Sequence, residues 1–221
     1  LALDPVTLAR TTLVGNANLL YGPLDLAVNG DGDFVFTNRY AEPIAPTFTR
    51  YGVGLFKYSR ATRKLTTIAT TVQLGRPGNW QGGLGIDIDT GDYVLQDRDW
   101  DAGAPLLRIN DAGNITTLAT GLDPRYTITQ DVRTGAWYSP AGSQIWVVQP
   151  NATKPTSLFA PGSGNGWHSA IAFDRASAAS PRIVSRNGRT LYFIDPANGT
   201  VTTTALAGLT DTPWAITFLN G

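Results

Sequence analysis

The sequence contains no cysteine and no methionine. The absence of cysteine excludes a disulfide framework, a thiolate nucleophile and a metal site with cysteine ligands. Glutamate and lysine are also rare: Glu42 is the only glutamate, and lysine occurs only at positions 57, 64 and 154. Because strong helix formers are scarce while Thr, Val, Ile and aromatic residues abound, we expect strands and tight turns and almost no helix.

An excess of charge is absent as well, since 17 basic and 17 acidic residues give a formal net charge of zero. A neutral chain lacks the positive surface that phosphate backbones require, so we expect no nucleic-acid partner. No apolar run approaches the roughly 20 residues that cross a bilayer, so we expect no membrane partner. The lack of an initiator methionine suggests a processed or excerpted chain, and we expect a soluble protein that is secreted or periplasmic.

A hairpin motif occurs five times along the chain. Each copy consists of an apolar stretch, a turn and a Thr-rich strand, which is the pattern of two antiparallel strands joined by a short connection. The Thr-rich strands are predicted at Ala9–Leu13, Arg63–Ile68, Gly113–Leu118, Lys154–Leu158 and Thr200–Thr204. Such a repeat decides the architecture before any single segment does.

A second repeated unit, two strands around a Gly or Asp turn, precedes every hairpin except the first. Its first strands are predicted at Leu24–Val28, Leu84–Ile88, Ile128–Val132 and Ala170–Phe173. Its second strands are predicted at Phe34–Phe36, Tyr93–Leu95, Trp137–Tyr138 and Arg182–Val184. A fifth first strand, Ala215–Phe218, is followed only by three further residues.

The first two of these strands begin 60 residues apart, and the later ones begin at spacings of about 42 to 45 residues. Four short antiparallel strands in such a period are typical of a β-propeller blade. We therefore predict an all-β fold, a β-propeller of four-stranded antiparallel blades that forms a single domain over residues 1–221. The additional residues of the longer first repeat are predicted to form an extended surface loop between Arg39 and Gly52, which contains Pro43 and Pro46.

The two ends of the chain predict one further blade. Residues 1–15 supply the third and fourth strands of a blade, and the C-terminal residues supply a first strand. Joined, they would form a three-stranded blade that closes a five-bladed ring and removes its exposed edges. The alternative is that the sequence is a fragment of a larger, six-bladed propeller.

Three stretches carry a resemblance to known propellers: GPLDLAVNGDGDFVFT at 22–37, GLGIDIDTGDYVL at 83–95 and LRINDAGNITTL at 107–118. They resemble NHL-repeat blades and their relatives in the SMP-30/gluconolactonase and virginiamycin B lyase propellers. The resemblance implies the fold, but these blades serve scaffolds, binding proteins and enzymes alike.

The catalytic residues that the resemblance implies do not all find counterparts in this sequence. SMP-30-like lactonases hold a divalent cation at the axis with Glu, Asn and Asp, and strictosidine-synthase-like enzymes place a Glu there. Here Glu42 lies in the predicted loop. The virginiamycin lyase relatives depend on His and Glu, and His168 is the only histidine. We therefore favour a binding protein over an enzyme.

Aromatic residues precede the predicted innermost strands. Blade entry segments gather at one mouth of the axial channel, where exposed rings can stack on sugars or apolar ligands. Packing between the blades is the alternative for each of them. The residues are Tyr21, Trp80, Tyr126, Trp167 and Trp214. His168 follows Trp167 directly and is a candidate base, ligand or hydrogen-bond donor, or a structural histidine.

Two groups of acidic residues are further candidates. Asp97, Asp99 and Asp101 place three carboxylates at alternate positions, with Asp111 further on, and clustered oxygens suit Ca²⁺. They lack the Gly and Glu of an EF-hand, so solvated turns are the alternative, and we predict no cofactor beyond a possible Ca²⁺. The second group lies on or beside innermost strands, where it could face the axis and a ligand or simply a water-filled channel. It consists of Asp25, Asp87, Asp131 and Gln130.

These features predict a propeller that binds a small molecule, a carbohydrate or a protein at the mouth of its channel. The candidate ligand-binding residues are Tyr21, Asp25, Trp80, Asp87, Trp167, His168 and Trp214. One alternative is a metal-dependent lactonase or hydrolase of the SMP-30-like kind, with a cation held by axial Asp and Asn side chains. Another is a scaffold that only binds proteins. Neither the ligand nor the oligomeric state follows from the sequence.

Overall fold

The structure is a computed structural model, and it describes residues 2–3, 10–11, 19–45, 48–70, 81–97, 104–122, 127–141, 144–158, 170–174 and 182–207. The regular secondary structure in these ranges consists of strands alone, β1 to β18. No helix long and apolar enough to cross a membrane occurs in the described ranges. The predicted all-β composition is therefore confirmed.

Sixteen of the strands, β3 to β18, form four sheets of four antiparallel strands, which we call blades 1 to 4. Blade 1 contains β3 (Leu19–Val28), β4 (Phe34–Ala45), β5 (Phe48–Tyr58) and β6 (Leu65–Ala69). Blade 2 contains β7 (Gln81–Ile86), β8 (Tyr93–Asp97), β9 (Ala104–Ile109) and β10 (Ile115–Leu122). Blade 3 contains β11 (Thr129–Gln130), β12 (Trp137–Ala141), β13 (Gln144–Val148) and β14 (Thr156–Leu158). Blade 4 contains β15 (Ala170–Asp174), β16 (Arg182–Asn187), β17 (Thr190–Ile194) and β18 (Val201–Ala205).

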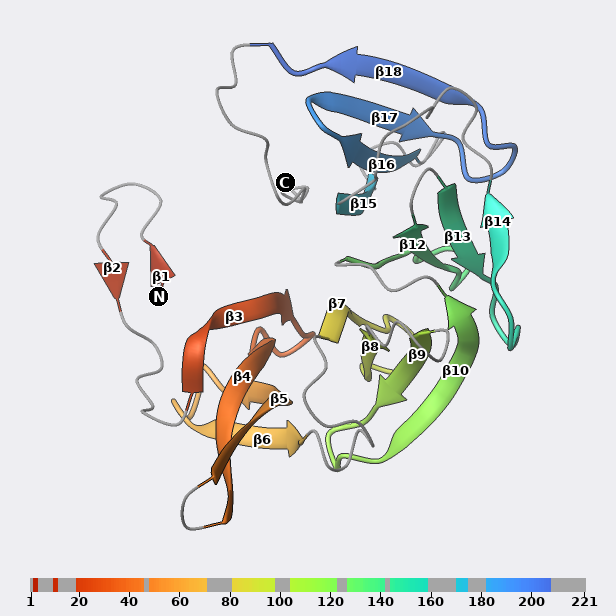
Figure 1. The fold of residues 1–221 in the computed structure, drawn as a ribbon. Coiled ribbons are helices and arrows are strands. Elements are labelled where there is room, and N and C mark those ends of the chain that lie inside the picture. Colours follow the sequence, from red (N-terminus) through yellow and green to blue (C-terminus); the bar gives the residue numbers. More distant parts are fainter. Residues whose placement is uncertain are drawn as a thin grey trace.

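The blades are arranged around a common centre, with β3, β7 and β15 nearest to it and β6, β10, β14 and β18 on the outside (Figure 1). Each blade runs outward in chain order from its first strand to its fourth. The fold is a β-propeller of four-stranded blades, as the repeat predicts.

In blades 1 to 3, the turn after the innermost strand is fixed by an Asx residue and a glycine. In blade 1, Asn29 Oδ1 accepts hydrogen bonds from the backbone N–H groups of Asp31 and Asp33. Gly32 has a φ of 78°, a left-handed conformation that glycine adopts without a steric penalty. Gly91 has a φ of 75° in the corresponding turn of blade 2. The sequence repeat thus encodes the same chain reversal in successive blades.

The predicted loop between Arg39 and Gly52 is wrong, because these residues extend the hairpin of β4 and β5. Their register pairs Tyr40 with Gly52, Glu42 with Arg50 and Pro43 with Thr49. Strand β3 pairs with β4 only as far as Tyr40. Beyond this point β4 has one neighbour, so a residue without an N–H group, Pro43, is tolerated there.

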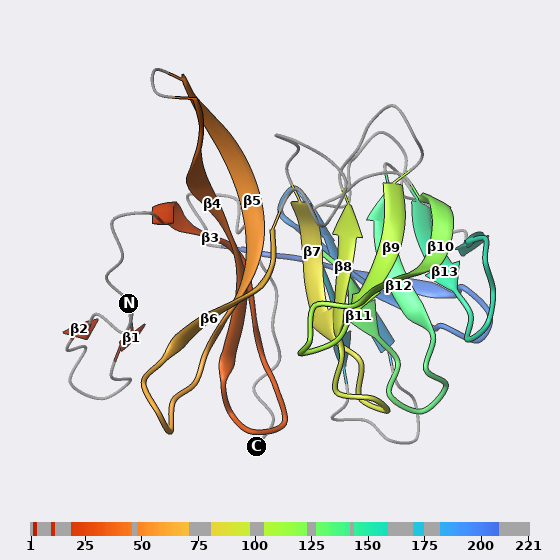
Figure 2. The ribbon, with the colours of Figure 1, turned by 90° about the horizontal axis from the view of Figure 1, so that it is seen from below.

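The first predicted hairpin is confirmed by β1 (Ala2–Leu3) and β2 (Arg10–Thr11), which pair Ala2 with Thr11 and Leu3 with Arg10. This pair lies on the side of blade 1 that faces away from blade 2 (Figures 1 and 2). The predicted fifth first strand, Ala215–Phe218, lies outside the described residues.

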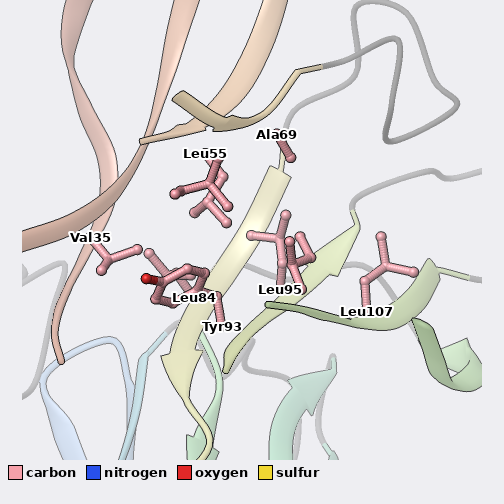
Figure 3. Packing of buried hydrophobic residues seen from close by; sticks show 9 residues of the cluster. Val35, Leu55, Ala69, Leu84, Tyr93, Leu95 and Leu107 are labelled. Carbon is pink, nitrogen blue, oxygen red and sulfur yellow. The ribbon is translucent and has the colours of Figure 1, made fainter. Parts of the chain in front are cut away.

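Apolar side chains of neighbouring blades form the core. The cluster between blades 1 and 2 contains Val35 and Leu55 from blade 1 and Leu84, Tyr93 and Leu95 from blade 2 (Figure 3). Similar clusters join blades 2 and 3 and blades 3 and 4. Burying one such Leu, Ile or Val side chain contributes about 1.5–3 kcal/mol, so packing between blades stabilises the ring without disulfides.

Candidate functional site

The strand directions divide the propeller into two ends. Strand β6 leaves blade 1 at Ala69, opposite Leu55, and β7 of blade 2 begins at Gln81, opposite Asp97. The segments that enter blades therefore lie at the same end as the hairpins between second and third strands. We call this end the entry face, and we call the other end, with the turns after the innermost strands, the turn face (Figure 2).

Most of the predicted site residues cannot be placed in detail. Trp80, Trp167, His168, Trp214, Asp99 and Asp101 lie outside the described residues, as does Tyr126. Tyr21 lies in β3 and Asp97 ends β8, and only their backbone is described. Topology still links two of the groups: Trp80 directly precedes Gln81, which pairs with Asp97 at the entry face.

Asp25 joins blade 1 to blade 2. Its Oδ2 accepts a hydrogen bond from the backbone N–H of Leu84 on β7, at 2.7 Å, and its Oδ1 accepts one from Leu26, at 2.8 Å. Burial raises the pKa of Asp25 from 3.8 to about 6, although both N–H donors favour the charged form. The carboxyl group thus connects two innermost strands and has both of its oxygens engaged.

Thr127 makes the corresponding contact between blades 3 and 4. Its Oγ1 accepts a hydrogen bond from the backbone N–H of Ile171, at 3.1 Å. The strand registers make Thr127 the counterpart of Asp25, and Ile171 the counterpart of Leu84. The role of Thr127 was not predicted from the sequence, and alignment of the repeats at these positions is the signal that could have found it.

Asp87 lies at the turn face, where its buried carboxylate fixes the turn of blade 2. Its Oδ1 accepts the backbone N–H of Asp89 at 3.0 Å, and its Oδ2 forms an ion pair with Arg108 of β9. The side chain is only 2% exposed. A buried carboxylate needs such compensation, since an isolated charge in the interior is costly.

Asp131 occupies the same place in blade 3. Its carboxylate pairs with Arg133, with Oδ2 at 2.9 Å from Nη2. Burial would raise the pKa of Asp131, but the hydrogen bonds and charge of Arg133 outweigh it and hold the pKa below its ordinary value. The neighbouring Gln130 accepts the backbone N–H of Ile88 through Oε1, at 3.0 Å, and so links blade 3 to the turn of blade 2.

Asp111 lies in the turn after β9 and connects blades 1 and 2 on the outside of the molecule. Its carboxylate accepts hydrogen bonds from Lys57 Nζ at 2.6 Å and from the Tyr93 hydroxyl. Although burial opposes it, these contacts lower the pKa of Asp111. Burial and the neighbouring Asp111 raise the pKa of Tyr93.

Asp25, Asp87, Asp111 and Asp131 therefore serve as contacts within and between blades. Among the described part of the chain, no group of three or more His, Asp or Glu side chains is arranged to hold a metal ion. The calcium site at Asp97, Asp99 and Asp101 and the binding roles of the entry-face aromatic residues stay predictions.

No family model matches the chain, and no curated protein matches it in sequence. Solved structures share its fold. A gluconolactonase from Xanthomonas campestris, XC5397, is similar with a TM-score of 0.56 and 16% identity, over 82% of this chain and 57% of that one. The chain thus spans just over half the length of that enzyme.

The extracellular domain of BT4673 from B. thetaiotaomicron, a hybrid two-component system, is similar with a TM-score of 0.55 and 14% identity, over 91% of this chain and 32% of that one. A second structure of a BT4673 extracellular domain, described as a one-component system, has a TM-score of 0.50 and 15% identity, over 85% of this chain and 28% of that one. At these identities the likenesses show the propeller fold alone.

Proposed function

We propose that the protein binds a ligand at the entry face of its propeller. The observation that supports this proposal best is the long hairpin of β4 and β5, which rises beyond the other blades at that end (Figure 2). In blades 3 and 4, by contrast, only two residues join the second strand to the third, residues 142–143 and 188–189. A hairpin that extends from one blade enlarges the surface that a ligand can contact beside the channel mouth. Loops and extensions at one end of a rigid scaffold commonly form binding sites.

The ligand class that suits this face is a carbohydrate, a small molecule or a protein segment. Tyr21 lies near the start of β3, and Trp80, Trp167, His168 and Trp214 lie just before innermost strands in the sequence repeat. The innermost strands begin at the entry face. Aromatic rings that are partly exposed at such a mouth stack on sugar faces and apolar groups. Two of the similar structures are extracellular domains, and this supports a secreted or periplasmic location.

A metal-dependent lactonase or hydrolase is the second candidate function. It is favoured by the likeness of the fold to a gluconolactonase. The contacts of Asp87 with Arg108 and Asp89 leave this carboxylate poorly suited to an axial cation, and this argues for the binding function. A scaffold for proteins is the third candidate.

Quenching of tryptophan fluorescence by a panel of oligosaccharides, together with a glycan array, tests the binding function. We expect saturable quenching that falls at least tenfold in affinity in Trp80→Ala and Trp167→Ala variants. Trp146→Phe is the matched control, since Trp146 packs within the core between blades 2 and 3. Equal affinity in all three variants would place the ligand away from the entry face.

Metal analysis and lactone turnover test the enzyme. A stoichiometric cation that is lost together with lactone hydrolysis in Asp87→Ala would favour the lactonase and contradict the binding proposal. A protein scaffold would show neither sugar binding nor turnover.

A further inference from the structure

We infer that residues 214–218 pack as an innermost strand against Leu26 and Val28 of blade 1, with Ala215 and Thr217 turned toward them. The inference identifies the segment of this chain that covers the free inner face of blade 1. It does not depend on the proposed function, because it concerns only how the inner strands meet.

The first observation is that Leu26 and Val28 are exposed, whereas their counterparts are buried or partly buried. Leu26 is 53% exposed and Val28 is 54% exposed. The positions that match Leu26 in blades 2, 3 and 4 are 6%, 8% and 3% exposed, and they are occupied by Leu84, Ile128 and Ile171. In each of those blades the side chain packs against the preceding blade. Blade 1 therefore presents the same apolar inner face without a described blade before it.

The second observation is a rule of alternation along the innermost strands. Positions on the side of the next blade carry Gly, Ala, Thr or Asp, and we call them the short positions. Positions on the side of the preceding blade carry Leu, Ile, Val, Phe or Gln, and we call them the long positions. The short positions are Asp25 and Ala27, Gly83 and Gly85, Thr127 and Thr129, and Ala170 and Ala172. The long positions are Leu26 and Val28, Leu84 and Ile86, Ile128 and Gln130, and Ile171 and Phe173.

Crowding near the axis is the physical reason for this rule. A Cβ atom added to Gly83 would lie 2.3 Å from the backbone N of Ile128, and one added to Gly85 would lie 2.6 Å from the ring of Trp137. Two long side chains cannot share this space, so a long side chain must meet a short one.

The sequence of the C-terminal segment obeys the same rule. Aligned with Ala170–Phe173 of blade 4, it places Ala215 and Thr217 at the short positions and Ile216 and Phe218 at the long ones. Ala215 and Thr217 would then face Leu26 and Val28, which are the long positions that lack a partner. A shift by one residue would turn Ile216 and Phe218 toward them instead.

The hydrogen bonds of Leu26 agree with this register. At two other junctions the N–H of the matching residue is accepted by a side chain of the preceding blade, Asp25 for Leu84 and Thr127 for Ile171. The side chain of Ala215 has no acceptor, and the N–H of Leu26 donates instead to Asp25 Oδ1. Asp25 thus accepts the backbone N–H groups of both Leu26 and Leu84.

The last observation is the place of the N-terminal hairpin. Strands β1 and β2 lie on the side of blade 1 that faces away from blade 2 (Figures 1 and 2). Leu26 and Val28 are turned to this side as well, because they alternate with Asp25 and Ala27, which contact blade 2. The outer part of that side carries an aromatic cluster drawn entirely from blade 1, with Phe36 stacked on Phe56 at 5.7 Å and Phe34 stacked on Tyr58 at 6.5 Å. The hairpin and residues 214–218 would therefore cover the outer and inner parts of one face.

A pair of engineered cysteines tests the inference, and the chain offers no cysteine of its own to interfere. We expect the Leu26→Cys/Ala215→Cys variant to form a disulfide within one chain under mild oxidation. The reason is that Gly83, the counterpart of Ala215, lies against the backbone of Ile128, which is the counterpart of Leu26. The crosslinked form should move faster in non-reducing electrophoresis, and its melting temperature should exceed that of the reduced form by roughly 5–10 °C.

The control is Leu26→Cys/Ile216→Cys, in which the second thiol points to the other side of the strand. It should crosslink at less than about a tenth of the yield. Should the first variant fail to fold by circular dichroism, Val28→Cys/Thr217→Cys carries the same expectation. A crosslink between two chains would assign the face to a second copy. Equal yields in the test and control variants, or no crosslink in either folded test variant, would also overturn the inference.

Discussion

At the scale of single residues, the inner seams depend on side-chain acceptors that reach from one blade to the backbone of the next. Asp25 and Thr127 perform this task with different chemistry at equivalent positions. The sequence alone does not decide the role of either side chain, because a carboxylate or hydroxyl on an innermost strand could equally face the channel. What the sequence does not reveal is the direction of each side chain around the ring, because a single strand pattern gives two faces without saying which blade each face meets.

The Thr127 contact predicts a difference between two conservative variants. Thr127→Val keeps the shape but leaves the N–H of Ile171 without its acceptor, so the free energy of unfolding should fall by about 1–2 kcal/mol. Thr127→Ser keeps the hydroxyl and should lose less than about 1 kcal/mol. Urea denaturation measures both, and a Val variant as stable as the Ser variant would show that the bond contributes little.

The raised pKa of Asp25 predicts a pH dependence of stability. Its folded-state pKa of about 6 lies above the ordinary value of 3.8. The contribution of the protonated carboxyl is therefore fully present below about pH 4 and is lost as the pH rises through about 6. The cost of ionising Asp25 in the folded state at pH 7 is at most ~3 kcal/mol.

Asp25→Asn avoids this ionisation and keeps an amide oxygen for Leu84. The stability of the variant relative to the wild type should therefore increase between pH 4 and pH 7, as followed by thermal melts. Asp31→Asn, in an exposed turn, is the control for the removal of one carboxylate. A stability difference for Asp25→Asn that does not change with pH, or that changes no more than in the control, would contradict the assignment.

At the scale of strands and hairpins, the sequence predicted most of the fold because the same strand and turn pattern recurs. The turns with Asn29 and Gly32 are encoded locally, and their positions were predicted correctly. The hairpin beyond Tyr40 was not predicted, because Pro43 and Pro46 are typical of loops. Cross-strand pairing overrode this signal where β4 has lost its other neighbour.

The close approach of β7 to the start of blade 3 predicts that Gly83 tolerates no side chain. A Cβ atom there would lie 2.3 Å from the Ile128 nitrogen and 2.5 Å from the carbonyl carbon of Thr127. Because both are backbone atoms, Gly83→Ala should lower the free energy of unfolding by about 2–3 kcal/mol. Gly30→Ala, with no atom within 4 Å of the added Cβ, should change it by less than about 1 kcal/mol. Thermal melts of both variants check the contrast.

The extended hairpin can be removed without touching a blade junction. Replacing residues 41–51 by Asn-Gly joins the paired residues Tyr40 and Gly52 through a two-residue turn. The melting temperature should change by less than about 3 °C, since residues 41–51 of the two strands pair only with each other. Ligand affinity at the entry face should fall at least tenfold by fluorescence titration. An unchanged affinity would remove the hairpin from the binding surface.

At the scale of the whole molecule, the sequence predicted the propeller, whereas its binding site stays a prediction. The blade architecture follows from periodicity, and the all-β structure and the likeness to propeller structures agree with it. A ligand site depends on which segments meet across the ring, and no repeat encodes that. The described carboxylates illustrate the gap, since Asp87 proved to be bound to Arg108 at the turn face.

Removal of the N-terminal hairpin should destabilise the whole ring. Deleting residues 1–15 takes away β1 and β2 from the side of blade 1 that bears Phe36 and Phe56. We expect an increase in the binding of a hydrophobic dye and self-association by size-exclusion chromatography, together with a lower melting temperature. A deletion variant that stays monomeric with an unchanged melting temperature would show that the hairpin covers nothing essential.

Because short positions meet long positions along the innermost strands, the two faces of a blade differ, and they follow one another in the same order around the ring. Each of the three described seams, between blades 1 and 2, 2 and 3, and 3 and 4, joins one kind of surface to its complement, so each of these blades presents the same pair of surfaces. Duplication or loss of one repeat would therefore leave the kind of contact between the remaining blades unchanged. The contacts do not fix the number of blades in a ring, which is set by the wedge shape of the sheets. Rings with different numbers of blades can arise from such units by gene rearrangement alone, without new interface chemistry.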